Sequence, residues 1–164
     1  MLELEIGGER LRLNPAAISA LRYRAQYGKS VVTDLMGAAT PEQLEACLIR
    51  LLHVMQEEEA LSLLDMAALC RRDAQFLQKA IAARDALLDA SKAQKHDEPV
   101  EGAEPFDEYR VLALMAAARL DMSLLHELPI LHLLEVVTLC FEGRSEKKAY
   151  RPMNQKELHA LYPR

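Results

Sequence analysis

The stretch LELEIGGERLRLNP, residues 2–15, decides the first structural element of the chain. Apolar and charged residues alternate strictly on both sides of Gly7-Gly8, which is typical of two strands joined by a two-residue turn. Such a turn sets the register of facing residues: Leu2–Leu13, Glu3–Arg12, Leu4–Leu11, Glu5–Arg10 and Ile6–Glu9. The leucines therefore share one face of a hairpin, and opposite charges pair on the other. Because an isolated hairpin is marginal in water, we expect its leucine face to pack on helices.

The remainder of the chain is predicted to be helical. Leu and Ala dominate, hydrophobic residues make up 51% of the 164 residues, and Trp is absent. Capping signals and apolar periodicity predict helices over 14–27, 30–36, 40–55, 57–70, 72–93, 106–120, 123–128 and 129–141. The first of these starts at Asn14-Pro15, and the fourth starts at an acidic run, Glu57 to Glu59. We therefore expect a mainly α protein, a multi-helix bundle-like domain with a short N-terminal β-hairpin.

Composition changes at residues 92–105, KAQKHDEPVEGAEP. This stretch contains two prolines, a glycine and several charges, with almost nothing to bury, so it is predicted to be a linker. It divides the chain into an N-terminal hairpin and helical domain, 1–91, and a C-terminal helical segment, 106–164. That segment ends in a basic tail, in which Asn154-x-x-Glu157 predicts a last short helix.

Charge and cysteine content narrow the class of protein. The net charge of −5 does not suit a general nucleic-acid binder. Three cysteines lie far apart with no C-x-x-C spacing, which indicates a reduced intracellular setting. The N-terminus does not resemble a signal peptide, and no apolar run approaches the roughly 20 residues that a membrane span requires. We expect neither a membrane nor a nucleic acid as partner.

Gly28-Lys29-Ser30 matches the end of a phosphate-binding P-loop, G-x-x-x-x-G-K-[ST]. The first glycine of that motif would stand at position 23, which is Tyr23, and the preceding residues indicate a helix where the motif requires a strand. Without that glycine the loop cannot wrap its N–H groups around phosphates. We therefore interpret Gly28 as a helix stop and predict no nucleotide cofactor.

No other motif indicates catalysis. The five histidines show no metal-ligand spacing, and no nucleophile signature is present. Residues 112–137 resemble a helix-turn-helix in their sequence pattern. The segment that would be its recognition helix, 129–141, carries no Arg, Lys, Asn or Gln to contact DNA. The sequence predicts no catalytic residue, no metal site and no cofactor, and hence no enzyme.

Two regions are candidates for binding a partner. Tyr23 and Tyr27 lie four apart on one helical face beside Arg24, where packing is favoured over partner binding. The helix 129–141 is nearly apolar all round, so it is either central to the core or buried against a partner. Its candidate partner-binding residues are Leu131, Leu134, Val137 and Phe141.

Residues 21–35, LRYRAQYGKSVVTDL, resemble a segment of the tail assembly chaperones of long-tailed phages, particularly those of Gram-positive bacteria. The matching residues are Tyr23, Arg24, Tyr27, Gly28, Lys29, Asp34 and Leu35. Residues 114–137 resemble an alanine-rich helix followed by a Leu-rich helix near the C-terminus of longer members, with Asp121 where a Gly is usual.

This resemblance implies a helical, non-enzymatic protein in the cytoplasm of a bacterial host. It would coat the tape measure protein of a phage or prophage while tail tube subunits are recruited and polymerise around it. Two alternatives stay open. One is another phage structural or scaffold protein that forms homo-oligomers, and the other is a helical DNA-binding regulator that uses the basic tail.

Overall fold

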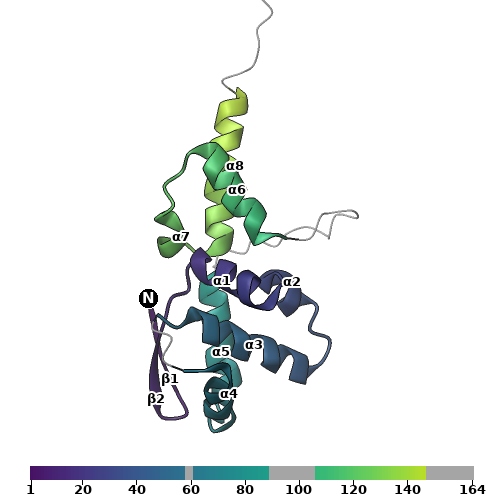
Figure 1. Cartoon of the computed structure of the whole chain (residues 1–164), viewed down its shortest axis with the longest axis vertical. Helices are drawn as coiled ribbons and strands as arrows, with labels where there is room; N and C mark the ends of the chain where they lie inside the picture. The colour runs from purple at the N-terminus through teal and green to yellow at the C-terminus, as the bar shows by residue number, and fades with distance from the viewer. Residues whose placement is uncertain (58–60, 89–105, 147–164) are drawn as a thin grey trace, which may run out of the picture.

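The computed structural model describes residues 1–57, 61–88 and 106–146, without the side chains of 142–146 (Figure 1). The protein is mainly α with an N-terminal hairpin, as predicted. The hairpin strands are β1 (Leu2–Ile6) and β2 (Glu9–Leu13). The helices are α1 (Ala17–Tyr27), α2 (Val31–Met36), α3 (Pro41–Met55), α4 (Leu63–Arg71), α5 (Phe76–Leu88), α6 (Glu108–Ala118), α7 (Leu124–Glu127) and α8 (Ile130–Glu146). The predicted linker, 92–105, and the predicted helix at 154–157 lie outside the described residues.

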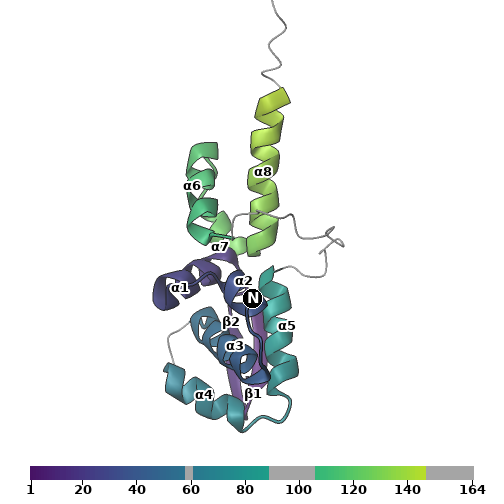
Figure 2. The same ribbon diagram turned by 90° about the vertical axis from the view of Figure 1, so that its right-hand side faces the viewer.

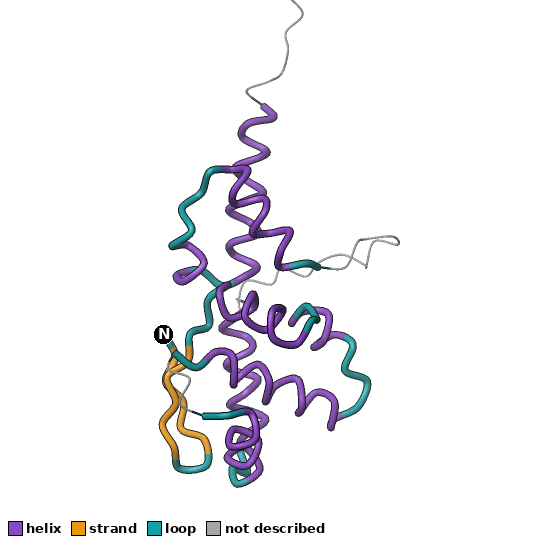
Figure 3. The backbone as a smooth tube through the Cα atoms, in the orientation of Figure 1, coloured by secondary structure: helices purple, strands orange, loops and turns teal. Residues whose placement is uncertain are grey.

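The hairpin has the predicted register at every facing pair from Leu2–Leu13 to Ile6–Glu9. Both turn glycines have positive φ, 58° at Gly7 and 91° at Gly8, a conformation that other residues adopt only with strain. Ile6 and Leu13 are fully buried, while the glutamates of β1 are exposed. The strands lie along one side of the helical body (Figure 3), so the helices cover the leucine face as expected.

The first helix begins later than predicted, at Ala17. Asn14 does not cap it, because the Asn14 N–H donates to the Met55 carbonyl (2.7 Å) and its side chain accepts from the Ala16 N–H (3.0 Å). The backbone therefore stays extended beyond β2, against the end of α3. The Ala17 N–H, at the start of α1, donates to the Leu128 carbonyl (2.7 Å).

Two further helix starts were predicted too early. Helix α4 begins at Leu63, capped by Ser62, rather than at Glu57, whose N–H donates to the Arg12 carbonyl (3.2 Å) and extends the pairing of the hairpin. Helix α5 begins at Phe76 rather than Arg72, because Asp73 organises a turn. Its carboxylate accepts from the N–H groups of Gln75 (2.8 Å) and Gly7 (3.0 Å) and from the Lys79 ammonium (2.7 Å). Long-range hydrogen bonds override the local signals at both places.

The predicted helix stop at Gly28 and the predicted cap at Thr40 are confirmed, whereas α8 continues to Glu146, beyond the predicted end at 141. Gly28 ends α1 in the left-handed conformation, with φ 70°. The Ser30 side chain caps α2, and Thr40 Oγ1 caps α3 by accepting from the Gln43 N–H (3.3 Å). The Gln43 side chain accepts from the Ala39 N–H (2.9 Å), one residue before the expected partner.

The core is one continuous apolar cluster with α3 near its centre. Helix α3 contacts α1, α2, α4 and α5. The largest fully buried side chains are Tyr23, Ile6, Leu13, Leu48, Leu51, Leu52, Met55, Met66, Leu87, Met115, Ile130 and Leu133. The same cluster contains residues from both predicted parts of the chain, so the described portions of those parts pack on each other. The division into 1–91 and 106–164 otherwise stays a prediction.

Helices α6 and α8 lie side by side and stand on α1, with α7 beside their base (Figure 2). We call residues 106–146 the α6–α8 layer. Within the described residues, none of the helices has the length and apolar character needed to cross a membrane.

Candidate functional site

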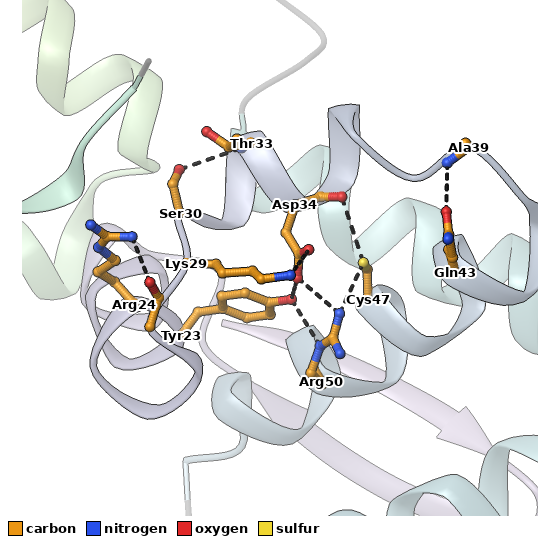
Figure 4. Close-up of polar contacts among 11 residues, drawn as sticks. Tyr23, Arg24, Lys29, Ser30, Thr33, Asp34, Ala39, Gln43, Cys47 and Arg50 are labelled. Carbon is orange, nitrogen blue, oxygen red and sulfur yellow. Dashed lines mark hydrogen bonds and ion pairs between the residues drawn. The ribbon is translucent and has the colours of Figure 1, made fainter. Parts of the chain in front are cut away.

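Two of the residues that carry the resemblance, Tyr23 and Asp34, form a polar cluster with Arg50 between α1, α2 and α3 (Figure 4). The Tyr23 hydroxyl donates to Asp34 Oδ2 (2.5 Å), and Arg50 Nη2 donates to the same oxygen (2.8 Å). Arg50 Nε in turn donates to the Tyr23 hydroxyl oxygen (3.1 Å). These bonds close a triangle, the Tyr23–Asp34–Arg50 cluster, with one corner on each helix.

The protonation states of this cluster favour a stable contact between the three helices. Burial and the hydrogen bond to Asp34 raise the pKa of Tyr23, so its hydroxyl stays protonated. Burial works against ionisation of Asp34, but the bond from Tyr23 and the charges of Arg50 and Lys29 outweigh it and hold the pKa of Asp34 below 3.8. At neutral pH the cluster is therefore an ion pair joined to a neutral phenol.

The surroundings of the cluster are filled by packed side chains. Arg50 lies over the Tyr27 ring at 5.7 Å from its centroid, and the Tyr23 and Tyr27 rings are 4.9 Å apart. Cys47 Sγ lies 3.1 Å from Arg50 Nη2, and burial raises the pKa of this thiol. The two tyrosines pack against each other, as the favoured interpretation expected, and partner binding by this pair stays a prediction. Tyr23 is fully buried, so of the two predicted partner-binding tyrosines only Tyr27 keeps any exposed surface.

Arg24 does not stack on the neighbouring tyrosines of α1. Its guanidinium lies 5.8 Å from the centroid of the Tyr109 ring, on α6, and Nη1 donates to the Gly28 carbonyl (2.8 Å). Its Nε lies 4.0 Å from Asp107 Oδ1. Arg24 therefore connects the end of α1 to the beginning of α6.

A second polar site, Glu108, lies at the same junction, and no sequence signal indicated it. Glu108 is fully buried, and its Oε1 accepts from the Ser30 hydroxyl (2.8 Å) and the Val31 N–H (2.9 Å). Its Oε2 is buried without a hydrogen-bond partner. Burial raises the pKa of Glu108, although its hydrogen bonds and Arg24 act in the opposite direction. In sequence it is an ordinary acidic residue in a first helical turn.

A groove of about 780 Å³ opens beside this junction. Its charged lining residues are the cations Arg24, Lys29 and Arg110 and the anions Asp34 and Asp107. The opposite charges interleave, since Lys29 Nζ is 3.7 Å from Asp34 Oδ1. The groove therefore has no strong preference for ligands of one charge.

Helix α8 divides the predicted partner-binding residues between core and surface. Val137 is fully buried together with Ile130 and Leu133, so it belongs to the core. The other three predicted residues remain accessible: Leu134 and Phe141 are half-buried and pack against the core, and Leu131 is 37% exposed.

The more exposed apolar side of α8 carries a residue that sequence reasoning did not single out, Leu139, which is 58% exposed. Val136 and Cys140, half-buried, lie three residues before it and one residue after it. The i, i+3 and i+4 spacing of these three residues puts them on one side of the helix. The sequence of α8 puts apolar residues on almost every side of the helix, so periodicity alone did not distinguish this side from the core side.

Among the residues that the structure describes, no three His, Cys, Asp or Glu side chains come close enough together to hold a metal ion. Comparison with family models, curated proteins and solved structures found no match to this chain.

Proposed function

We propose that this chain is a non-enzymatic binding protein, a tail assembly chaperone of a phage or prophage, in the cytoplasm of the bacterial host. It would hold apolar helical segments of the tape measure protein while tail tube subunits are recruited. The resemblance of residues 21–35 and 114–137 supports the family. The structural observation that carries the proposal is the outer apolar side of α8, which we call the α8 strip: Val136, Leu139 and Cys140.

The α8 strip suits a helical partner. One side of α8 is held in the core by Ile130, Leu133 and Val137. The α8 strip lies on the adjoining side of the helix, with Leu139 farthest from the core, so it is presented on a supported element. An amphipathic helix recognises such a surface by placing its apolar residues against it. The net charge of −5 favours solubility of a protein that exposes leucines.

The residues of the resemblance have a supporting role in this proposal. Tyr23 and Asp34, together with Arg50 outside residues 21–35, join three helices, and Arg24 links α1 to α6. They therefore hold the base on which the α6–α8 layer stands and need not contact the partner themselves.

Co-expression with a candidate tape measure protein from the same genome tests the proposal. We expect the wild-type chain to keep that protein soluble and to co-purify with it. Leu139→Asp should abolish co-purification, since it puts a charge in the centre of the α8 strip. Leu64→Asp is the matched control, because Leu64 is 81% exposed on α4, away from α8, and this variant should bind as the wild type does.

Two results would count against the proposal. One is a wild-type chain that is folded but does not co-purify with a folded tape measure protein. The other is equal binding by the Leu139 and Leu64 variants, which would move the partner surface away from α8.

Self-association is the second candidate, because the α8 strip of one copy could pair with that of another. Light scattering on the isolated chain separates the two functions. A defined oligomer that Leu139→Asp converts to a monomer would favour a self-assembling structural protein. A monomeric mass over a wide range of concentrations would exclude it.

A further inference from the structure

We propose that Glu108 is a proton-linked latch that fastens the α6–α8 layer onto the turn between α1 and α2. The proposal is independent of the function proposed above, because it concerns only how two parts of this chain dock.

The geometry of the latch joins residues far apart in the chain. Glu108 opens α6, and its Oε1 accepts two hydrogen bonds from the start of α2, 77 and 78 residues away: 2.9 Å from the Val31 N–H and 2.8 Å from the Ser30 hydroxyl. Both partners belong to the start of α2, since Ser30 is its capping residue and Val31 its first residue. A single carboxyl group therefore connects the base of the α6–α8 layer to the N-terminal body.

The second carboxyl oxygen of Glu108, Oε2, explains why protonation favours the docked layer. Oε2 is buried and has no hydrogen-bond partner, so an ionised carboxylate would leave half of its charge unsolvated. Burying an uncompensated charge costs more free energy than burying a neutral group. A proton on Oε2 removes that charge and leaves Oε1 free to accept both bonds. The docked conformation of the α6–α8 layer is therefore more stable when Glu108 is neutral than when it is ionised.

The charged groups of the neighbouring elements modify this preference without cancelling it. Arg24 of α1 favours the ionised form, but its hydrogen bond goes to Gly28 and its near anion is Asp107. In the turn before α2, Lys29 lies nearest Asp34 of α2, which also pairs with Arg50 of α3.

The remaining titratable groups belong to the layer itself. Helix α6 carries Arg110, which lines the groove beside the latch, and α8 carries His132 and Glu135, at half-buried and exposed positions. Burial outweighs these influences, and the pKa of Glu108 lies above its ordinary value of 4.5.

Docking of the layer is coupled to protonation of Glu108. The pKa of Glu108 is raised in the docked state, so docking takes up a proton. The stability that the latch contributes is fully present below pH 4.5 and is lost as pH rises through the raised pKa. Between those two values the ratio of undocked to docked layer should rise by up to about tenfold for each pH unit.

Hydrogen exchange of the Val31 amide tests the latch directly, because this N–H is bonded to Glu108. After correction for the intrinsic pH dependence of exchange, the protection factor of Val31 in the full chain should fall by up to about tenfold per pH unit between pH 4.5 and the raised pKa of Glu108. In Glu108→Gln it should stay constant, because glutamine keeps an oxygen acceptor but does not titrate. Glu135→Gln, the same change at an exposed position of α8, should behave as the wild type does.

A carbon-13 titration of the Glu108 carboxyl in the wild-type chain gives a second measurement that needs no variant. A midpoint above 4.5 supports the latch. A midpoint at or below that value, or a Val31 protection factor that is constant or rises with pH in the wild type, would overturn it. This titration tests the latch even if the Glu108→Gln variant does not fold.

Discussion

Replacing Asp34 by alanine should destabilise the fold by about 3 kcal/mol, because it removes the shared acceptor of the Tyr23–Asp34–Arg50 cluster. Asp34 Oδ2 accepts from the Tyr23 hydroxyl and from Arg50 Nη2, which come from α1 and α3. The substitution therefore disconnects both helices from α2 at one point. It leaves a buried hydroxyl without an acceptor and a guanidinium without its carboxylate.

The magnitude follows from the exposure of each partner. A hydrogen bond to a charged group contributes about 1.5–3 kcal/mol, and an orphaned buried donor costs about 1–3 kcal/mol. Tyr23 is fully buried, so its hydroxyl cannot turn to water. The Arg50 side chain is 29% exposed, so water recovers part of its loss. The two terms are not additive, and together they give about 3 kcal/mol.

Denaturant unfolding of the wild type and the Asp34→Ala variant measures this loss. Lys29→Ala is the matched control, since Lys29 also pairs with Asp34 but is 69% exposed and 3.7 Å away, so it should cost about 1 kcal/mol or less. A double-mutant cycle with Tyr23→Phe isolates the bond between the two residues and should give a coupling of about 1 kcal/mol or more.

The pH dependence provides an independent check. The pKa of Asp34 is below 3.8 in the folded protein, so its contribution is present above that value and is lost as pH falls through the folded pKa. Asp34→Asn should therefore flatten the acid limb of the stability profile. The reasoning would be refuted by an Asp34→Ala loss no larger than that of Lys29→Ala, since the cluster would then stabilise nothing.

Two further predictions concern the turns. Gly28→Ala should lower the free energy of unfolding by about 1 kcal/mol, because φ is 70° but a Cβ would meet nothing. Gly7→Ala should lower it by about 2–4 kcal/mol, because φ is 58° and a Cβ would also lie 2.7 Å from the Leu69 carbonyl oxygen. Equal losses in denaturant unfolding would contradict this difference. The hydrogen bonds from Lys79 and from two backbone N–H groups lower the pKa of Asp73 to about 2, so its stabilising effect should be present above pH 3.8 and lost as pH falls towards 2. Asp73→Asn should remove that loss from a plot of melting temperature against pH, and an unchanged plot would be the contrary result.

Part of the candidate site was visible in the sequence. Tyr23, Lys29 and Asp34 lie within one continuous segment, and the local signals correctly placed Tyr23 and Asp34 on two helices, with Gly28 and Lys29 between them. Arg50 could not be assigned to the same cluster, because it belongs to the next helix and its position relative to Asp34 depends on how α2 and α3 cross. Glu108 could not be found for the same reason, since its partners are 77 and 78 residues away.

The sequence by itself determined the features that depend on neighbouring residues. The hairpin register follows from the two-residue period and the Gly7-Gly8 turn, and the caps at Ser30 and Thr40 follow from side chains that reach the N–H groups three residues on. These interactions close short loops, so local residues suffice to specify them.

Only the tertiary structure decided which competing local signal prevails and which apolar residues are buried. Helices α1, α4 and α5 begin later than predicted because Asn14, Glu57 and Asp73 form hydrogen bonds to distant parts of the chain. Helix α8 is apolar on most sides, so its own residues do not specify a core face. Packing on α1, α5 and α6 buries Val137 and leaves Leu139 exposed, because burial depends on what lies opposite a side chain.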